Sequence, residues 1–412
     1  MSQYDWIIQG GRVIDPANDI DGHHDVAIAS GKIVAVGERL DAGLAAKVYD
    51  ATGNVVAPGL VDLHTHTYHR VTPLGIDADH FCLGRGVTTA VDTGSAGYDT
   101  FPGFRAFAVE PAQTRLLAFL NISRIGLAVG RSTDGDEPGE LEAMKLISGD
   151  KCVACARENE DLIIGVKVRL SASIADNGRN EPEAYRHSRE AAEELGLPLM
   201  THHSFSSVPL EACPGILRAG DIYTHCFHGF DSTVIDLSSR RVHDVVLEAK
   251  RRGVVFDLGH GMGGFNYKVA EICSEAGIWP DAISTDMHTL TCDGPAYDMP
   301  TVMTKMIALG MPLHEVIRAS TITPAEAIGW GDRIGTLGVG READVAVLNF
   351  DEIDMELEDT IGQMRRIEHR LTAVAVWRAG EPGAITQPRL FPNPVQIDKG
   401  RSLAPQAVVR DD

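Results

Sequence analysis

The sequence is short of basic residues, with 37 lysines and arginines against 58 aspartates and glutamates in 412 residues. The resulting formal net charge of −21 would repel a nucleic-acid backbone or an anionic membrane surface, since both bind clustered basic side chains. Nucleic acid and membranes are therefore not expected as partners.

Long hydrophobic runs are also missing. No stretch reaches the ~18 apolar residues that a membrane-spanning helix needs. The first residues, MSQYDWIIQGG, do not combine a basic start with a long apolar stretch, which is the pattern of a secretory signal. We therefore expect a cytoplasmic protein.

Cysteines are too few, and odd in number, to form a disulfide framework. A chain of this size needs no disulfides for stability, and its seven cysteines cannot all pair, so we expect them to be reduced. Cys152 and Cys155 form a C-x-x-C without a second cysteine or histidine pair, which is a weak signal for structural zinc.

What is present is an ordinary globular composition, 44% hydrophobic and 23% charged, with no repeats or low-complexity tracts. Strand-like and helix-like stretches alternate over residues 58–330, which predicts a parallel α/β sheet. Short strands with turns before and after it predict a small β-domain from residues 1–57 and 331–387, followed by a C-terminal tail at 388–412. Individual expectations include a strand at 55–63, helices at 181–195 and 313–328, and strands at 344–348 and 372–377.

The strongest chemical signal is His64-Thr65-His66, at the end of the first of these buried strands. Residues i and i+2 of a strand point to the same face, so both imidazoles can reach one metal ion. A His-x-His alone is common, and its context decides its meaning.

That context is PGLVDLHTH (residues 58–66), which resembles the opening motif of the amidohydrolase superfamily. Thr201-His202, Thr224-His225 and Ser284-Thr285-Asp286 are similar to the ends of that superfamily's fifth, sixth and eighth strands. The resemblance implies that the sheet closes into a (β/α)₈ TIM-like barrel, joined to a small β-sandwich domain built from both chain ends.

Lys167 lies inside the apolar strand 164–170, where an unpaired ammonium group would be costly to bury. It could extend toward solvent or pair with a carboxylate. In the binuclear branch of the superfamily, the lysine at this position is carbamylated and bridges two metal ions.

The resemblance implies a binuclear centre of two divalent cations, with a bridging hydroxide as the nucleophile. Zinc suits imidazole ligands best, although manganese or iron would also fit. Asp286 would receive the proton of the hydroxide and pass it to the leaving group. The implied ligands are His64, His66, carbamylated Lys167, His202, His225 and Asp286, with His203 as a second choice.

Substrate-binding residues are less sharply indicated. Arg169 shares a strand face with Lys167, so its guanidinium could hold a substrate carboxylate, or it could pair with Asp92 or Asp257. A lone histidine near a strand end is often structural. The further candidates for substrate binding are Tyr68, His228, His260 and His288.

The substrate class rests on a second resemblance. Residues 74–77, 85–89, 168–171 and 224–229 are similar to a dihydroorotase-related amidohydrolase/deacetylase branch. This implies a hydrolase that deacetylates a small carboxylate-bearing N-acetyl or O-acetyl compound. Dihydroorotases typically carry an arginine where this chain has Tyr68, which argues against an orotate-pathway role.

Three alternatives remain open. The first is a cyclic-amide hydrolase of the dihydroorotase or hydantoinase type, with the same metals and a different pocket. The second is a non-catalytic scaffold relative, and the third is a deaminase, although Phe205 stands where that branch carries a glutamate base. The resemblance also implies a homo-oligomer that acts on a small-molecule substrate.

Overall fold

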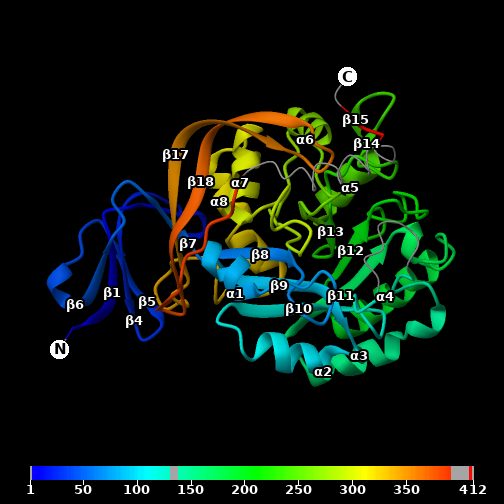
Figure 1. Cartoon of the computed structure of the whole chain (residues 1–412), viewed down its shortest axis with the longest axis horizontal. Coiled ribbons are helices and arrows are strands. Elements are labelled where there is room, and N and C mark those ends of the chain that lie inside the picture. Colours follow the sequence, from blue (N-terminus) through cyan, green and yellow to red (C-terminus); the bar gives the residue numbers. More distant parts are fainter. Residues whose placement is uncertain (1, 130–137, 391–407, 411–412) are drawn as a thin grey trace.

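The computed structural model describes residues 2–129, 138–390 and 408–410, which form a β-domain and a larger α/β domain (Figure 1). Seven parallel strands of the α/β domain form one sheet in the order β16-β13-β12-β11-β10-β9-β8. These strands are β8 (Leu60–Thr65), β9 (Val87–Gly97), β10 (Arg115–Asn121), β11 (Ile163–Leu170), β12 (Leu199–His203), β13 (Ile222–Thr224) and β16 (Val255–Phe256).

Residues 282–287 occupy the eighth strand position and close the sheet. Ala282 forms a parallel bridge with Asp257 beyond β16, and Met287 forms one with Thr65 of β8. The amide of His66 also donates to the carbonyl of Met287 at 2.9 Å. The predicted α/β barrel is confirmed, and the carboxyl ends of its strands share one rim.

The helices connect these strands, and most lie on the outside of the barrel (Figure 1). They are α1 (Ala78–Phe81), α2 (Phe101–Phe104), α3 (Gly149–Glu158), α4 (Glu181–Leu195), α5 (Asp244–Arg252), α6 (Tyr267–Glu275), α7 (Met299–Ala308), α8 (Leu313–Ala319) and α9 (Ile322–Ala327). The helix expected at 181–195 is α4.

The single helix expected at 313–328 is wrong, because the chain breaks between α8 and α9. Pro324 has no N–H to donate to the carbonyl of Ser320, which a continuous helix would require. That carbonyl instead accepts a hydrogen bond from Val61 of β8, at 2.9 Å. The break therefore ties α8 to the barrel wall.

The strand expected at 55–63 is also two strands. β7 (Val55–Pro58) pairs with strands of the β-domain, and β8 begins at Leu60 in the barrel. Gly59 lies between them, and a Cβ there would come within 2.2 Å of the Thr88 hydroxyl oxygen. The chain thus changes domain at a glycine that no larger residue could replace without displacing Thr88.

The β-domain consists of two packed sheets from both ends of the chain. One has the order β5-β4-β1-β6 and the other β19-β18-β17-β7-β2-β3. Trp377 lies between them, with its ring 5.5 Å from that of Trp6 and 5.1 Å from that of Tyr49. The strands are β1 (Tyr4–Gln9), β2 (Arg12–Asp15), β3 (Ile20–His23), β4 (Asp25–Ala29), β5 (Lys32–Gly37), β6 (Ala45–Asp50), β17 (Val345–Glu358), β18 (Met364–Arg378) and β19 (Glu381–Pro382).

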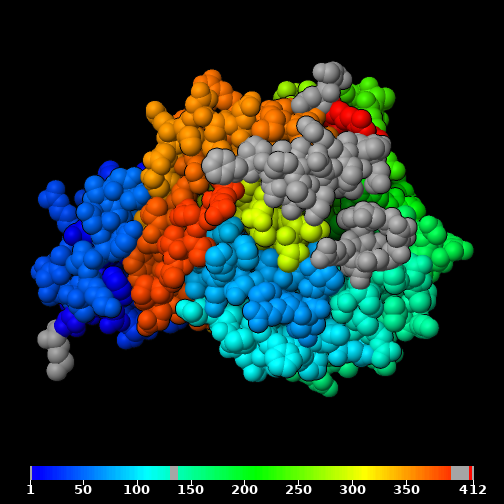
Figure 2. Space-filling model, in the orientation of Figure 1, coloured from blue at the N-terminus to red at the C-terminus, as the bar shows by residue number. Residues whose placement is uncertain are grey.

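Strands β17 and β18 are much longer than the stretches 344–348 and 372–377 that were expected. They form an antiparallel hairpin that leaves the β-domain and passes over α7 toward α6 (Figure 1). The hairpin covers the flank of the barrel in the surface view (Figure 2). The hairpin therefore contacts both domains, through β7 at one end and α7 along its length.

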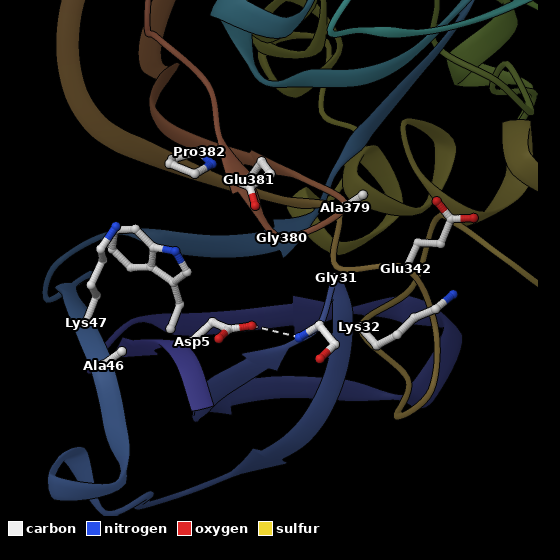
Figure 3. A pocket seen from close by; sticks show the side chains of 12 residues that line it. Asp5, Gly31, Lys32, Ala46, Lys47, Glu342, Ala379, Gly380, Glu381 and Pro382 are labelled. Carbon is white, nitrogen blue, oxygen red and sulfur yellow. Dashed lines mark hydrogen bonds between the residues drawn. The ribbon is translucent and has the colours of Figure 1, made fainter. Parts of the chain in front are cut away.

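An open cavity of about 720 Å³ lies in the β-domain, beside the turn at 379–382 (Figure 3). Asp5, Lys32, Lys47 and Glu342 are among the residues that line it, and the Asp5 carboxylate accepts the amide of Ser30 at 2.7 Å. None of the expected metal or substrate residues lines this cavity, so it is separate from the candidate site.

The structure also bears on the expectations for the cysteines, for membrane-spanning helices and for part of the C-terminal tail. All seven cysteines are free thiols. In the described part of the chain, no helix has the length and apolar character needed to cross a membrane. Of the expected tail, residues 391–407 and 411–412 lie outside the described residues, whereas Val409 is buried and its amide donates to the carbonyl of Gly229 at 3.2 Å.

A buried ion pair joins the barrel to the β-domain. The guanidinium of Arg115, at the start of β10, contacts the carboxylates of Glu342 and Asp344 and donates to Thr89 at 2.8 Å. The Arg115 and Asp344 side chains are 6% and 2% exposed. Removing one partner would leave an uncompensated charge in the interior.

We expect Arg115→Met to lower the free energy of unfolding by about 3 kcal/mol, because it leaves Asp344 buried without its cation. Arg105→Met is the control, since Arg105 pairs with the exposed Asp161 at the surface, where such a pair contributes about 1 kcal/mol or less. Denaturant unfolding of the two variants makes the comparison. Equal losses in both would contradict a structural role for the buried pair.

Candidate metal centre at the barrel rim

Three potential ligands converge where β8 meets the eighth strand position. The Nε2 atoms of His64 and His66 lie 3.4 and 3.1 Å from Oδ1 of Asp286. One ligand atom from each of these residues falls within 4.8 Å of the others. The side chains of His64, His66 and Asp286 are 2%, 6% and 13% exposed, so the three potential ligands lie together in a largely buried site.

The hydrogen bonds of His64 fix which ring nitrogen faces the site. The Thr224 hydroxyl donates its only proton to Asp257 at 2.6 Å, so it can only accept from Nδ1 of His64, which lies 2.9 Å away. His64 thus carries its proton on Nδ1. Its Nε2 presents a lone pair to Asp286 Oδ1, and two such atoms repel each other unless a cation lies between them.

The histidines that follow β12 and β13 lie beside this pair. The ring centroid of His225 is 5.0 Å from that of His64 and 4.4 Å from that of His202. Nδ1 of His225 donates to the carbonyl of Gly259 at 2.6 Å, which leaves Nε2 as its lone-pair donor. Nε2 of His202 lies 2.7 Å from the Ser204 hydroxyl, so Nδ1 is the ring nitrogen that this contact leaves available for a metal ion.

Lys167 points into the same place from β11. Its side chain is 1% exposed, and among the described residues its Nζ has no hydrogen-bond partner. Burial lowers the pKa of Lys167 to about 7, so a large fraction of the amine is neutral at neutral pH. Lys167 therefore neither extends to solvent nor donates a hydrogen bond to a carboxylate among the described residues, which were the two alternatives to a metal-site role.

Burial also lowers the pKa values of the four histidines. The pKa falls to about 4 for His66 and His225, and well below the ordinary value for His64 and His202. At neutral pH these imidazoles are therefore uncharged, which is the form that binds metal ions.

Two of the six expected metal ligands have an unusual backbone conformation. His225 and Asp286 have φ values of 61° and 47°, in the left-handed region that residues other than glycine seldom adopt. His225 immediately follows β13, and Asp286 lies near the end of the eighth strand position, so both left-handed residues lie at the carboxyl rim of the barrel. Such conformations cluster at functional sites.

Two glycines leave room for these side chains. A Cβ on Gly264 would lie 2.4 Å from Nδ1 of His225, and a Cβ on Gly261 would lie 2.2 Å from Oδ2 of Asp286. The stretch 259–264 therefore packs against both side chains with no room for a methyl group.

Residues that the sequence did not single out hold the ligands in place. Asp62 accepts the amide and hydroxyl of Thr285 at 3.0 and 2.5 Å, next to Asp286. Ser95 lies 3.0 Å from Nδ1 of His66, and Asp257 holds Thr224. Only the position of Asp62, two residues before His64, hinted at such a role.

Arg169 is paired, but not with the residues considered as its partners. Its Nε and Nη2 donate to the two carboxylate oxygens of Glu140 at 2.5 and 2.6 Å, whereas Asp92 and Asp257 bind elsewhere. The Glu140 side chain is 1% exposed and that of Arg169 is 20% exposed. Glu140 lies outside the barrel strands, so strand pattern alone could not identify it.

The remaining candidates for substrate binding differ in whether they lie near the expected metal ligands or are held by hydrogen bonds elsewhere. His288 lies beside His66, with ring centroids 6.1 Å apart, and His228 is fully buried three residues after His225. By contrast, Tyr68 donates its hydroxyl to the carbonyl of Thr100 at 3.2 Å, and both ring nitrogens of His260 have hydrogen-bond partners.

His203, the second-choice ligand, faces away from the metal site. Its ring nitrogens lie 3.1 Å from the Tyr223 hydroxyl and 2.8 Å from the carbonyl of Val208. The strand alternation expected for neighbours of His202 therefore holds here.

Residues 266–382 match the model of the amidohydrolase family. The chain is 35% identical to a protein named deacetylase from Agrobacterium fabrum, over 82% of this chain and 81% of that one. It is 34% identical to a deacetylase from Brucella anthropi over 84% of each. A crystal structure described as a dihydroorotase superimposes with a TM-score of 0.84 at 32% identity, covering 93% of this chain and 98% of that one.

We expect Gly264→Ala to reduce bound divalent metal or turnover by about 10- to 100-fold, because the new methyl group displaces His225 from its bond to Gly259. Gly149→Ala is the control, since a Cβ there meets no atom closer than 3.6 Å. Metal content after dialysis and thermal unfolding are measured on both. Wild-type metal content and turnover in Gly264→Ala would contradict this packing argument.

Proposed function

The chain belongs to the amidohydrolase family, and from this membership we propose that it is a metal-dependent deacetylase of a small, carboxylate-bearing N-acetyl or O-acetyl compound. It is a hydrolytic enzyme of the amidohydrolase type. The deacetylase reaction is supported by relatives of that name that align over more than four fifths of this chain.

One observation carries the metal-dependent part of the proposal. Lone pairs on Nε2 of His64 and Oδ1 of Asp286 face each other in a buried site beside His66. Lys167 directs its amine there, and among the described residues that amine has no hydrogen-bond partner. This donor set fits divalent cations, which would relieve the repulsion among those atoms.

His64 and His66 would hold one cation and His202 and His225 a second, and carbamylated Lys167 and Asp286 would supply the acidic ligands. Zinc suits a set of four imidazoles and two acidic groups. Burial lowers the pKa of Lys167 to about 7, which favours carbamylation, because only the neutral amine can react with carbon dioxide.

Bound divalent cations would lower the pKa of water to near 7 and polarise the substrate carbonyl. Asp286 would then accept the proton of the attacking water and deliver it to the leaving amine or alkoxide. Gly261 packs against the Asp286 carboxylate, which limits the positions that the carboxylate can take.

Arg169 is the proposed binding residue for the substrate carboxylate. Glu140 holds the Nε and Nη2 edge of the guanidinium, and Nη1 takes no part in that pair. A guanidinium orientated by a buried carboxylate is pre-organised for a second anion. His288, beside His66, is a further candidate for contact with the substrate.

We expect the purified protein to contain two divalent metal ions per chain and to release acetate from N-acetyl amino acids or O-acetylated hydroxy acids. Asp286→Asn should lower kcat by more than about 100-fold with little change in KM, because it removes the proton acceptor. Asp332→Asn is the control, since the Asp332 side chain is 99% exposed.

Elemental analysis and an acetate-release assay make these measurements. Hydrolysis of cyclic amides alone would replace the deacetylase by a ring hydrolase. Absence of bound metal would contradict the metal-dependent mechanism.

A second prediction concerns substrate charge. Arg169→Met combined with Glu140→Gln should lower kcat/KM about 30- to 100-fold for a carboxylate-bearing acetyl substrate, as expected for loss of a charged hydrogen bond of about 2–3 kcal/mol. Hydrolysis of a neutral acetyl ester should change little.

Glu140→Gln alone keeps the guanidinium and is the control. If kcat/KM of the double variant falls equally for the carboxylate-bearing and the neutral substrate, Arg169 does not bind the substrate carboxylate.

A further inference from the structure

Lys305 is a buried lysine outside the proposed metal centre. It lies on α7, is 0% exposed, and donates to Nε2 of His260 at 3.0 Å and to the carbonyls of Pro295 and Glu358 at 2.7 and 2.5 Å. An ammonium group has three protons, and each has an acceptor here. Burial lowers the pKa of Lys305 to about 8, so the amine remains mostly protonated at neutral pH.

The three acceptors come from three different segments at the carboxyl rim of the barrel. His260 follows β16, Pro295 precedes α7, and Glu358 ends β17 of the long hairpin. A methionine would fill the same space at a smaller desolvation cost. What the ammonium adds is three directional bonds that hold these segments in register.

The hairpin tip, which we define as residues 357–360, is anchored at this rim. Its four residues are at most 3% exposed. The hydroxyl of Thr360 donates to the carbonyl of Phe265 at 2.6 Å, and that of Tyr297 donates to the Glu358 carboxylate at 2.6 Å. The hairpin that leaves the β-domain therefore ends against the loop that precedes α6 (Figure 1).

The segment 259–261 connects His260 to the catalytic aspartate. The amides of His260 and Gly261 donate to the carbonyls of Ser284 and Thr285 at 3.1 and 2.9 Å, directly before Asp286. Gly261 also packs against the Asp286 carboxylate. A shift of His260 would therefore move the backbone that holds Asp286.

From these contacts we propose that Lys305 is a positioning residue, through which the hairpin tip fixes the loop that holds Asp286. The β-domain thereby sets the geometry of the catalytic aspartate without touching it. The inference rests on the proposed function in that it takes Asp286 as the group that transfers the proton. It also gives His260 a positioning role in place of the substrate contact expected for it.

Lys305→Met tests this proposal, because it keeps the length of the side chain and removes all three donors. We expect kcat to fall about 10- to 100-fold, as for other residues that orient ligands, while KM changes less than about threefold. Hydrogen–deuterium exchange should rise in peptides covering 258–267 and 284–298 and stay unchanged in β4 of the β-domain.

Lys250→Met is the matched control. Lys250 also extends from a barrel helix to a backbone carbonyl, that of Trp279, and pairs with Asp281, but at the amino-terminal end of the strands. We expect it to leave kcat and the exchange at 258–267 unchanged, even where thermal stability falls.

The proposal is overturned if Lys305→Met melts earlier yet keeps wild-type kcat and wild-type exchange at the rim. If Lys305→Met does not fold, Thr360→Val replaces it, because it removes one hydroxyl bond at the hairpin tip. It should lower kcat a few-fold and raise exchange at 258–267, and no change in either quantity contradicts the proposal.

The exchange measurement separates this inference from the proposed function. If the wild-type protein hydrolyses none of the acetyl compounds, the proposed reaction fails, and exchange at the rim alone decides on Lys305. A rise confined to the two rim segments supports the positioning role, and unchanged exchange overturns it.

Discussion

The structure depends on an electrostatic constraint at the barrel rim, where uncharged imidazoles and a carboxylate oxygen turn their lone pairs toward one buried point. His64 Nε2 and Asp286 Oδ1 are 3.4 Å apart, and the hydrogen bond of His64 to Thr224 leaves no proton between them. Such an arrangement is unfavourable by itself. Bound cations would make it favourable, and the amine of Lys167, which has no hydrogen-bond partner among the described residues, lies in the same place.

Much of the surrounding fold restrains those atoms. The outward nitrogens of His64 and His225 are bound to a hydroxyl and a carbonyl, and Asp62 holds the peptide before Asp286. Glycines at 261 and 264 remove the side chains that would otherwise displace them. The closed barrel supplies rigid strands, and the β-domain adds the hairpin that ends at the same rim. Both domains therefore contribute contacts that hold the rim residues in place.

Local patterns in the sequence predicted the elements that depend on local interactions. Alternation along β8 and the residue after it places His64 and His66 on one face, and an apolar strand around Lys167 marked that residue as unusual. Contacts between distant segments were not predictable in this way. The partner of Arg169 is Glu140 in a loop, and the hairpin was underestimated because residues 349–371 are rich in charges that a solvent-facing strand tolerates. Domain boundaries and ligand roles remain predictions.

Lys167 and the converging ligands would together form a two-cation centre. A crystal structure of the metal-loaded protein, measured on both sides of the zinc absorption edge, tests it directly. We predict two anomalous peaks, one between His64 and His66 and one between His202 and His225, with additional density on Nζ of Lys167 between them. A single peak, or an unmodified Lys167 beside an empty second position, would contradict the account.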